Sequence, residues 1–180
     1  MALSRPAIVE AALRILDQYG LGDLSMRRVA DDLGVQAGAL YYHVPNKQSL
    51  LAAVADHILA DGAGQAAGAD VSRTLTAWAD RLRSALLAHR DAAELVASAH
   101  ALGLGSVDPC QGGRDALIAA GIAEPDATMA ALLHFVLGHV MGEQTRAQLH
   151  ALGVVDSFDA AGSSRDFEWG VALLLRGILA

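Results

Sequence analysis

The sequence predicts an all-α protein, and three observations support this fold class. Apolar residues recur at spacings of three and four in one stretch after another, as on a helix with one buried face. No stretch combines apolar–polar alternation with β-branched residues, the pattern typical of a strand. Glycine and proline separate the periodic stretches. With 180 residues, of which 53% are hydrophobic, the chain can also bury a real core.

The N-terminal region predicts two helices in succession. The first follows Ser4, whose side chain can cap it, and ends at Gly20. The second is short, is capped by Ser25 and ends at Gly34. The buried face of the first helix consists of Ile8, Ala11, Ala12, Ile15, Leu16 and Tyr19. That of the second consists of Met26, Val29, Ala30 and Leu33.

A third short helix is expected from about Gln36 to His43, before the interruption at Pro45. Asn46 can cap a fourth helix, which runs on through Leu59. The stretch 61–68 is rich in glycine and alanine and predicts a linker. The helices expected beyond it cover residues 71–89, 91–102, 111–121, 126–151 and 165–179.

Charge and composition exclude several classes of protein. The net charge is −7, but residues 1–50 hold five basic and five acidic side chains, so the excess negative charge lies further on. This excludes a uniformly basic nucleic-acid coat and permits a local DNA-binding face. Cys110 is the single cysteine, which excludes a disulfide framework. No apolar run reaches the ~18 residues of a membrane span, and the N-terminal residues lack the order of a secretory signal. We expect a cytoplasmic protein with no membrane partner.

Residues 25–43 predict a helix-turn-helix, because two short helices flank a turn at Gly34. Apolar residues are spaced so that the two helices pack together, and the second helix is then free to enter a major groove. The packing residues are Val29, Ala30, Leu33, Val35 and Leu40. The outer face would carry Gln36, Ala37, Ala39, Tyr41 and His43. Tyr42 lies opposite Tyr41, and we expect it to pack inward.

In this region the chain resembles the tetracycline-repressor (TetR) family of bacterial transcriptional regulators. The resemblance rests on Leu24-Ser25-x-Arg27-x-Val29-Ala30-x-x-Leu33-Gly34-Val35, on Leu40-Tyr41-Tyr42-His43-Val44 and on Asn46-Lys47-x-x-Leu50-Leu51. It continues more weakly in Ala85-Leu86-Leu87-Ala88-His89-Arg90-Asp91, His134-Phe135-Val136-Leu137-Gly138 and Phe167-x-x-Gly170-x-x-Leu173. It therefore covers nearly the whole chain.

The resemblance implies which residues contact DNA. Arg27 matches an arginine that recognises a base edge, and a guanidinium can pair with guanine through two hydrogen bonds. Tyr41, His43 and Lys47 match positions that contact mostly phosphates. Ala37 and Gly38 stand where the family has a glutamine and a proline, so the operator should differ from the tetracycline operator. Gly38 costs about 1 kcal/mol relative to alanine, and we expect it to leave this helix softer until DNA binds. The predicted DNA-binding residues are Arg27, Gln36, Ala37, Gly38, Ala39, Tyr41, His43 and Lys47.

The helical body has candidate ligand-binding residues, although plain core packing is the alternative for each of them. They are Trp78, Arg81, Leu82, His100, Arg114, His134, Leu137, Met141 and Trp169. By the resemblance, His134 matches a histidine of the family's drug pocket, and Trp78 replaces a polar position, which suggests an apolar or aromatic ligand. The family's magnesium-associated histidine and glutamate correspond to Val96 and Gly142. We therefore expect no metal and no cofactor.

A homodimer is expected from the spacing Gly138-x-x-x-Gly142 and from the apolar surface of residues 167–179. Small residues permit close helix approach, and in the family the corresponding helices form a four-helix bundle across a two-fold axis. A two-fold dimer matches a palindromic double-stranded operator.

Together these patterns predict a DNA-binding domain over 1–47, a connecting helix over 48–64 and a ligand-binding and dimerisation domain over 65–180. The expected function is a transcriptional repressor released from its operator by a small-molecule inducer, whose usual target in the family is a transporter or biosynthetic gene. One alternative is a DNA-binding dimer with no ligand, and another is a ligand-binding or enzymatic body with a vestigial DNA-binding module. No catalytic motif is present, so we do not expect an enzyme.

Overall fold

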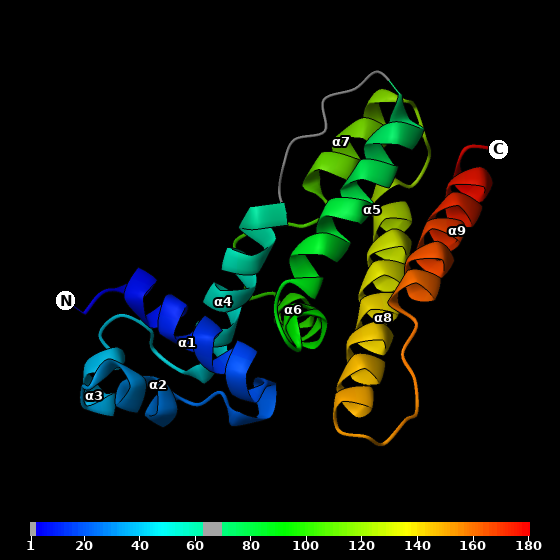
Figure 1. The fold of residues 1–180 in the computed structure, drawn as a ribbon. Coiled ribbons are helices and arrows are strands. Elements are labelled where there is room, and N and C mark those ends of the chain that lie inside the picture. The colour runs from blue at the N-terminus through cyan, green and yellow to red at the C-terminus, as the bar shows by residue number, and fades with distance from the viewer. Residues whose placement is uncertain (1–2, 63–69) are drawn as a thin grey trace. The chain divides into compact units, whose positions relative to one another are not determined.

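The computed structural model describes residues 3–62 and 70–180, and all regular elements in this part of the chain are helices (Figure 1). The prediction of an all-α fold is confirmed. The elements are α1 (Arg5–Tyr19), the 3₁₀ helix η1 (Leu21–Asp23), α2 (Met26–Leu33), α3 (Ala37–Leu40), α4 (Lys47–Gly62), α5 (Val71–Leu87), α6 (Ala92–Ala101), α7 (Gln111–Ala119), α8 (Pro125–Ala151) and α9 (Ala160–Ile178). Most of the predicted linker, 61–68, lies outside the described residues. No described helix combines the length and the apolar character that a bilayer span requires.

The chain divides into two compact units. The first contains residues 1–61 together with 86–107, and the second contains 62–85 together with 108–180. Helix α6 therefore belongs to the same unit as the N-terminal helices, although about thirty residues of sequence separate it from α4. Each unit has its own buried apolar core.

Helix α1 begins and ends as its sequence predicts. The Ser4 hydroxyl accepts a hydrogen bond from the Ala7 N–H, and the Gly20 N–H donates to the Leu16 carbonyl. Gly20 has φ +86°, a conformation that side chains disfavour, and a Cβ there would also lie 2.6 Å from Asp91 Oδ2. Glycine at this position thus allows α1 to stop and the α6 segment to approach.

The helix-turn-helix is formed by α2 and α3. Ser25 caps α2 by accepting the Arg28 N–H at 3.2 Å, and Gly34 ends it in the left-handed conformation. The prediction that the next helix extends to His43 is wrong, because α3 ends at Leu40 and the chain turns. The physical reason lies in Pro45, which disfavours helical geometry in the residue before it and cannot donate a backbone hydrogen bond.

Three aspartates join the α6 segment to the N-terminal helices of the first unit. The Asp17 carboxylate accepts the Arg90 N–H at 3.2 Å, and Asp91 accepts the Leu21 N–H at 2.8 Å. Asp56, in the middle of α4, accepts the Ser106 N–H at 2.8 Å, the Ser106 hydroxyl at 2.6 Å and the Val107 N–H at 2.9 Å. The apolar face of α6 is buried as well. These contacts explain why residues 86–107 pack with the N-terminal region.

The second unit contains most of α5 together with α7, α8 and α9, and α8 and α9 run side by side (Figure 1). Phe135 of α8 packs against Gly170 of α9, where a Cβ would collide with the ring. Helix α9 begins five residues before its predicted start, at Ala160, because the Asp159 carboxylate caps the first turn by accepting the Gly162 N–H.

Cys110 is buried at the start of α7. Burial, and secondarily the negative charge of Asp108, raise the pKa of its thiol to about 11. The thiol therefore stays protonated near neutral pH and is a poor nucleophile in the folded chain.

Candidate nucleic-acid interface

The predicted DNA-binding residues all reach the surface of the first unit. Six are exposed, namely Arg27, Gln36, Gly38, Tyr41, His43 and Lys47, and two are half-buried, namely Ala37 and Ala39. The apolar residues between them point inward: Leu40 and Val44 are completely or almost completely buried. The structure thus separates a packed inner face from an outer face of the kind the helix-turn-helix predicts.

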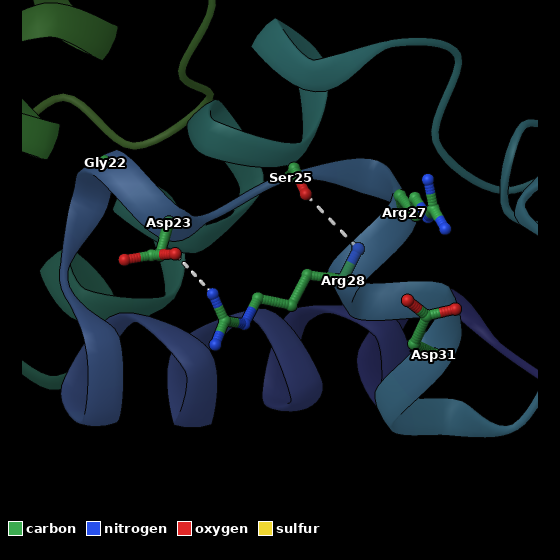
Figure 2. A pocket seen from close by; sticks show the side chains of 6 residues that line it. All are labelled: Gly22, Asp23, Ser25, Arg27, Arg28 and Asp31. Atoms are coloured by element: carbon green, nitrogen blue, oxygen red, sulfur yellow. Dashed lines mark hydrogen bonds and ion pairs between the residues drawn. The ribbon is translucent and has the colours of Figure 1, made fainter.

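Arg27 and Arg28 have different surroundings at the start of α2. The Arg28 guanidinium lies 3.8 Å from the centre of the Tyr19 ring and forms an ion pair with Asp23. Figure 2 shows Arg27 directed away from that ion pair. Within the part of the chain that the structure describes, the Arg27 side chain forms no ion pair or hydrogen bond. Arg27 therefore remains available to an external ligand, whereas Arg28 is already engaged.

An open hollow lies beside these arginines. It is lined by Gly22, Asp23, Ser25, Arg27, Arg28 and Asp31 (Figure 2). Asp23 offsets the charge of Arg28, so the positive charge in the hollow that lacks an ion-pair partner belongs to Arg27. This arrangement favours one specific contact over general attraction of a polyanion.

Tyr42 is exposed over 91% of its surface, so the prediction that it packs inward is wrong. The prediction assumed a helix through His43, whereas α3 ends at Leu40. The inward position is taken by Val44, whose N–H donates to the Leu40 carbonyl. The four-residue spacing of Leu40 and Val44 could have revealed this from the sequence. Tyr42 is thus a functional candidate that the sequence reasoning missed.

The candidate ligand residues differ in burial and are divided between the two units. In the second unit, Trp78, Leu82 and Leu137 are buried, and the Trp78 indole N–H donates to the Pro109 carbonyl at 2.6 Å. Three others from that unit, His134, Met141 and Trp169, are exposed. His100 is exposed and belongs to the first unit.

The two arginines among the ligand candidates differ in their partners. Arg114 forms ion pairs with Asp108 and Asp126, and hydrogen bonds to these carboxylates raise its pKa above its usual range. Arg81 has a buried Nε with no hydrogen-bond partner among the described residues. The Arg114 guanidinium is therefore already paired with carboxylates of the chain, whereas the Arg81 Nε–H has no acceptor among the described residues.

The sequence reasoning missed a buried polar cluster in the second unit. Arg83 Nη2 lies 2.9 Å from each carboxylate oxygen of Glu143 and 3.1 Å from the Ser164 hydroxyl. Beside it, His139 Nε2 lies 3.1 Å from the Ser163 carbonyl oxygen. The cluster connects α5, α8 and α9. Its only signal in the sequence is the four-residue spacing of His139 and Glu143 on α8.

Comparisons with known proteins agree with this geometry. Residues 8–54 match the family described as "Bacterial regulatory proteins, tetR family", and residues 65–157 match "Tetracyclin repressor-like, C-terminal domain". The Escherichia coli tetracycline repressor protein class A from transposon 1721 is 32% identical over 191 residues, which cover 95% of this chain and 88% of that protein.

Solved structures are similar over almost the full length. BioQ of Mycobacterium smegmatis is 39% identical with a TM-score of 0.91, and the match covers 98% of both chains. A structure of BioQ with its natural double-stranded DNA operator is 38% identical with a TM-score of 0.85, and the match covers 99% of both chains. The present chain therefore belongs to the TetR family and is a DNA-binding transcriptional regulator rather than an enzyme.

Proposed function

We propose that this chain is a homodimeric repressor that binds a palindromic operator through α2, α3 and the start of α4. The observation that carries the proposal is the unpaired, exposed Arg27 beside the engaged Arg28. A regulator needs a side chain that is presented from a fixed backbone position and is free to pair with a base. Arg27 lies in the first turn of α2, which Ser25 caps, and its guanidinium has no partner among the described residues. The operator-bound BioQ structure supports the same use of this fold.

The DNA-binding residues divide into two roles. Arg27 pairs with guanine and Gln36 with a neighbouring base, because both side chains can form two hydrogen bonds to a base edge. Tyr41, His43 and Lys47 contact the phosphate backbone and fix the register. The small side chains of Ala37, Gly38 and Ala39 keep α3, the recognition helix, narrow enough to enter the major groove. Tyr42 joins the second group because its ring is exposed beside them.

Dimerisation is assigned to the outer faces of α8 and α9. Met141, Trp169 and Leu173 expose apolar surface there, and Gly138 and Gly142 have no atoms within 4 Å of the position of a Cβ. Open glycines on a helix permit a second helix to approach closely. A two-fold dimer then places two recognition helices in successive major grooves, about 34–36 Å apart or somewhat more.

We also propose that a small apolar or aromatic ligand releases the repressor from its operator. In this proposal residues 1–47 bind DNA, residues 48–64 form a connecting helix, and residues 65–180 bind the ligand and dimerise. The protein would act in the cytoplasm. The name of the class A relative points to a small-molecule response. The ligand must bind the DNA-free and the DNA-bound states with different affinity in order to release the operator.

Fluorescence anisotropy with the DNA upstream of the protein's own gene tests this proposal. Binding should survive an excess of nonspecific competitor and should be lost in Arg27→Ala and Tyr41→Ala. Arg73→Ala removes an exposed arginine of the second unit and should leave the affinity unchanged. Weak binding that vanishes as salt is added, with no difference among the variants, would contradict sequence-specific recognition.

A dimer that binds DNA without any ligand is the second candidate. The tight packing of the second unit favours it: Phe135 fills the space at Gly170, Met129 fills the space at Gly113, and the Trp78 indole is bonded to backbone. A screen of apolar and aromatic compounds by thermal shift, followed by operator release, separates the two candidates. Compounds that stabilise the protein and release the operator support the ligand-responsive repressor.

A further inference from the structure

Asp31 lies on α2 one helical turn after Arg27 and lines the same hollow (Figure 2). Residues four apart on a helix are neighbours on its surface, with Cβ atoms about 5–6 Å apart. Figure 2 shows both side chains at the opposite end of the hollow from Asp23, which forms the ion pair with Arg28. Arg27 and Asp31 are thus a second pair of opposite charges in the hollow, and no ion pair joins them in the described part of the chain.

No contact of the described residues explains a carboxylate at position 31. The Asp31 side chain is exposed and forms no hydrogen bond or ion pair within residues 3–62 and 70–180. It lies in the last turn of α2, where the partial negative charge of the helix end disfavours an anion. Asp32, in the same turn, is different, because its carboxylate forms an ion pair with Arg14 of α1 at 2.6 Å. What distinguishes Asp31 is its place beside Arg27.

We infer that Asp31 determines specificity, because its carboxylate disfavours a DNA phosphate at Arg27 and tolerates a base there. This inference rests on the proposed role of Arg27 in base recognition. A phosphate that approaches Arg27 brings a negative charge next to Asp31, so attraction to one side chain is offset by repulsion from the other. The major-groove edge of guanine carries no net charge and offers the guanidinium two hydrogen-bond acceptors. Asp31 therefore costs little when Arg27 pairs with guanine.

The distinction between phosphate and base sets the affinity for incorrect sites. Binding to DNA of any other sequence is almost entirely electrostatic. The hollow has two basic and two acidic side chains, whose charges sum to zero, so it adds little to this general attraction. Specificity is the difference between the affinities for correct and incorrect sites, and a repulsive element can enlarge it. With Asp31 present, Arg27 contributes to binding chiefly where a base completes the contact.

Asp31→Asn tests the inference, with Glu94→Gln as a matched control. Each substitution removes one negative charge from an exposed side chain of the first unit that has no partner among the residues described. Glu94 lies in the first turn of α6, outside the helix-turn-helix. Asp31→Asn should raise the affinity for a non-operator duplex about fivefold and steepen its salt slope by about 1, because Arg27 can then bind a phosphate. Glu94→Gln should change this affinity by less than about twofold.

A double-mutant cycle with Arg27→Ala shows whether the two side chains act together. In the Arg27→Ala background, Asp31→Asn should leave non-operator affinity within about twofold, because the arginine that would bind the phosphate is absent. In the parent background, its effect on operator affinity should also stay within about twofold, since Arg27 is then paired with a base. Less competitor DNA should therefore displace the operator from Asp31→Asn. This variant should melt no lower than the parent protein, because an unfavourable charge leaves the helix end.

Three results would overturn the inference. Asp31→Asn could leave non-operator affinity unchanged, it could raise that affinity no more than Glu94→Gln does, or its effect could persist without Arg27. A change of preference at one operator base pair, with non-operator affinity unchanged, would show instead that Asp31 itself contacts a base. In each case the proposed function stands if Arg27→Ala abolishes competitor-resistant binding. If the parent protein shows no such binding, the proposed function is overturned and the inference falls with it.

Discussion

Arg27 and Arg28 are adjacent in the chain, yet the fold gives them different tasks. Arg28 stabilises the start of α2 through Tyr19 and Asp23, whereas Arg27 remains free. Arg28→Ala should lower the free energy of unfolding by about 1 kcal/mol and leave base preference intact, because the lost cation–π contact is worth about 0.5–1 kcal/mol and an exposed ion pair adds little. Arg27→Ala should cost about 1–3 kcal/mol of binding and relax preference at one base pair.

Urea unfolding and anisotropy with single-base-pair operator variants measure these effects. Lys47→Ala is a useful comparison, because removal of a phosphate contact should weaken binding to all sequences and reduce the salt slope by about 1. A change in base preference in Arg28→Ala, with none in Arg27→Ala, would reverse the assignment of the two arginines.

The Cys110 thiol makes the stability of the protein depend on alkaline pH. Burial raises its pKa to about 11 in the folded chain, so the folded state keeps this proton after the unfolded state has released it. Stability should therefore fall as the pH rises from the ordinary cysteine pKa of about 8.5 to about 11. Thermal melts of the parent protein and Cys110→Ala across this window should diverge, with the steeper loss in the parent. Parallel curves would contradict the assignment.

At the scale of elements, α4 is both the predicted phosphate contact and the anchor of a distant loop. Lys47 lies at its first residue, and Asp56 in its middle accepts hydrogen bonds from Ser106 and Val107. Asp56→Ala should increase the hydrogen-exchange rates of the Ser106 and Val107 amides by about tenfold, because a lost acceptor costs about 1–3 kcal/mol. Mass spectrometry or NMR measures these rates. Asp32→Ala, which breaks the exposed ion pair with Arg14, should leave them unchanged.

The spacing of apolar residues predicts most of these helices, because both the spacing and the helix depend on residues that are close together in the sequence. It locates α1, α2 and α8 to within one residue or so at each end. It fails at Tyr42, where Pro45 shortens α3, and at Ala160, where a first turn of small residues carries no large apolar side chain. The Arg83–Glu143 pair could not be predicted in this way, since sixty residues separate its partners and only tertiary packing brings them together.

At the scale of the whole molecule, the chain passes between its two units three times, near residues 61, 85 and 107. A fragment of residues 1–64 would lack the apolar face of α6 and the donors that satisfy Asp17 and Asp56. We expect this fragment to melt well below the full chain, or not to fold cooperatively, in circular dichroism. A fragment with the thermal stability of the full chain would show that the α6 segment is dispensable.

The proposed dimer surface predicts a linked loss of assembly and DNA binding. Trp169→Glu places a charge on the exposed face of α9, where burial in an interface would be costly. Analytical ultracentrifugation should show a monomer, and operator affinity should fall by more than tenfold because two half-sites no longer bind together. Asp166→Glu, also exposed on α9, keeps the charge and should remain dimeric. A dimeric Trp169→Glu would place the interface elsewhere.

The positions of Trp78 and Trp169 have a consequence for spectroscopy. They are the two tryptophans of the chain, and both belong to the second unit, one buried and one 65% exposed. The first unit holds all three tyrosines instead. Fluorescence excited selectively at the indole rings therefore reports on the second unit. The exposed Trp169 supplies the red-shifted part of this emission. With Trp169 in the proposed dimer interface, dilution below the dimer dissociation constant should shift the Trp169 emission further to the red, so tryptophan fluorescence would then measure self-association.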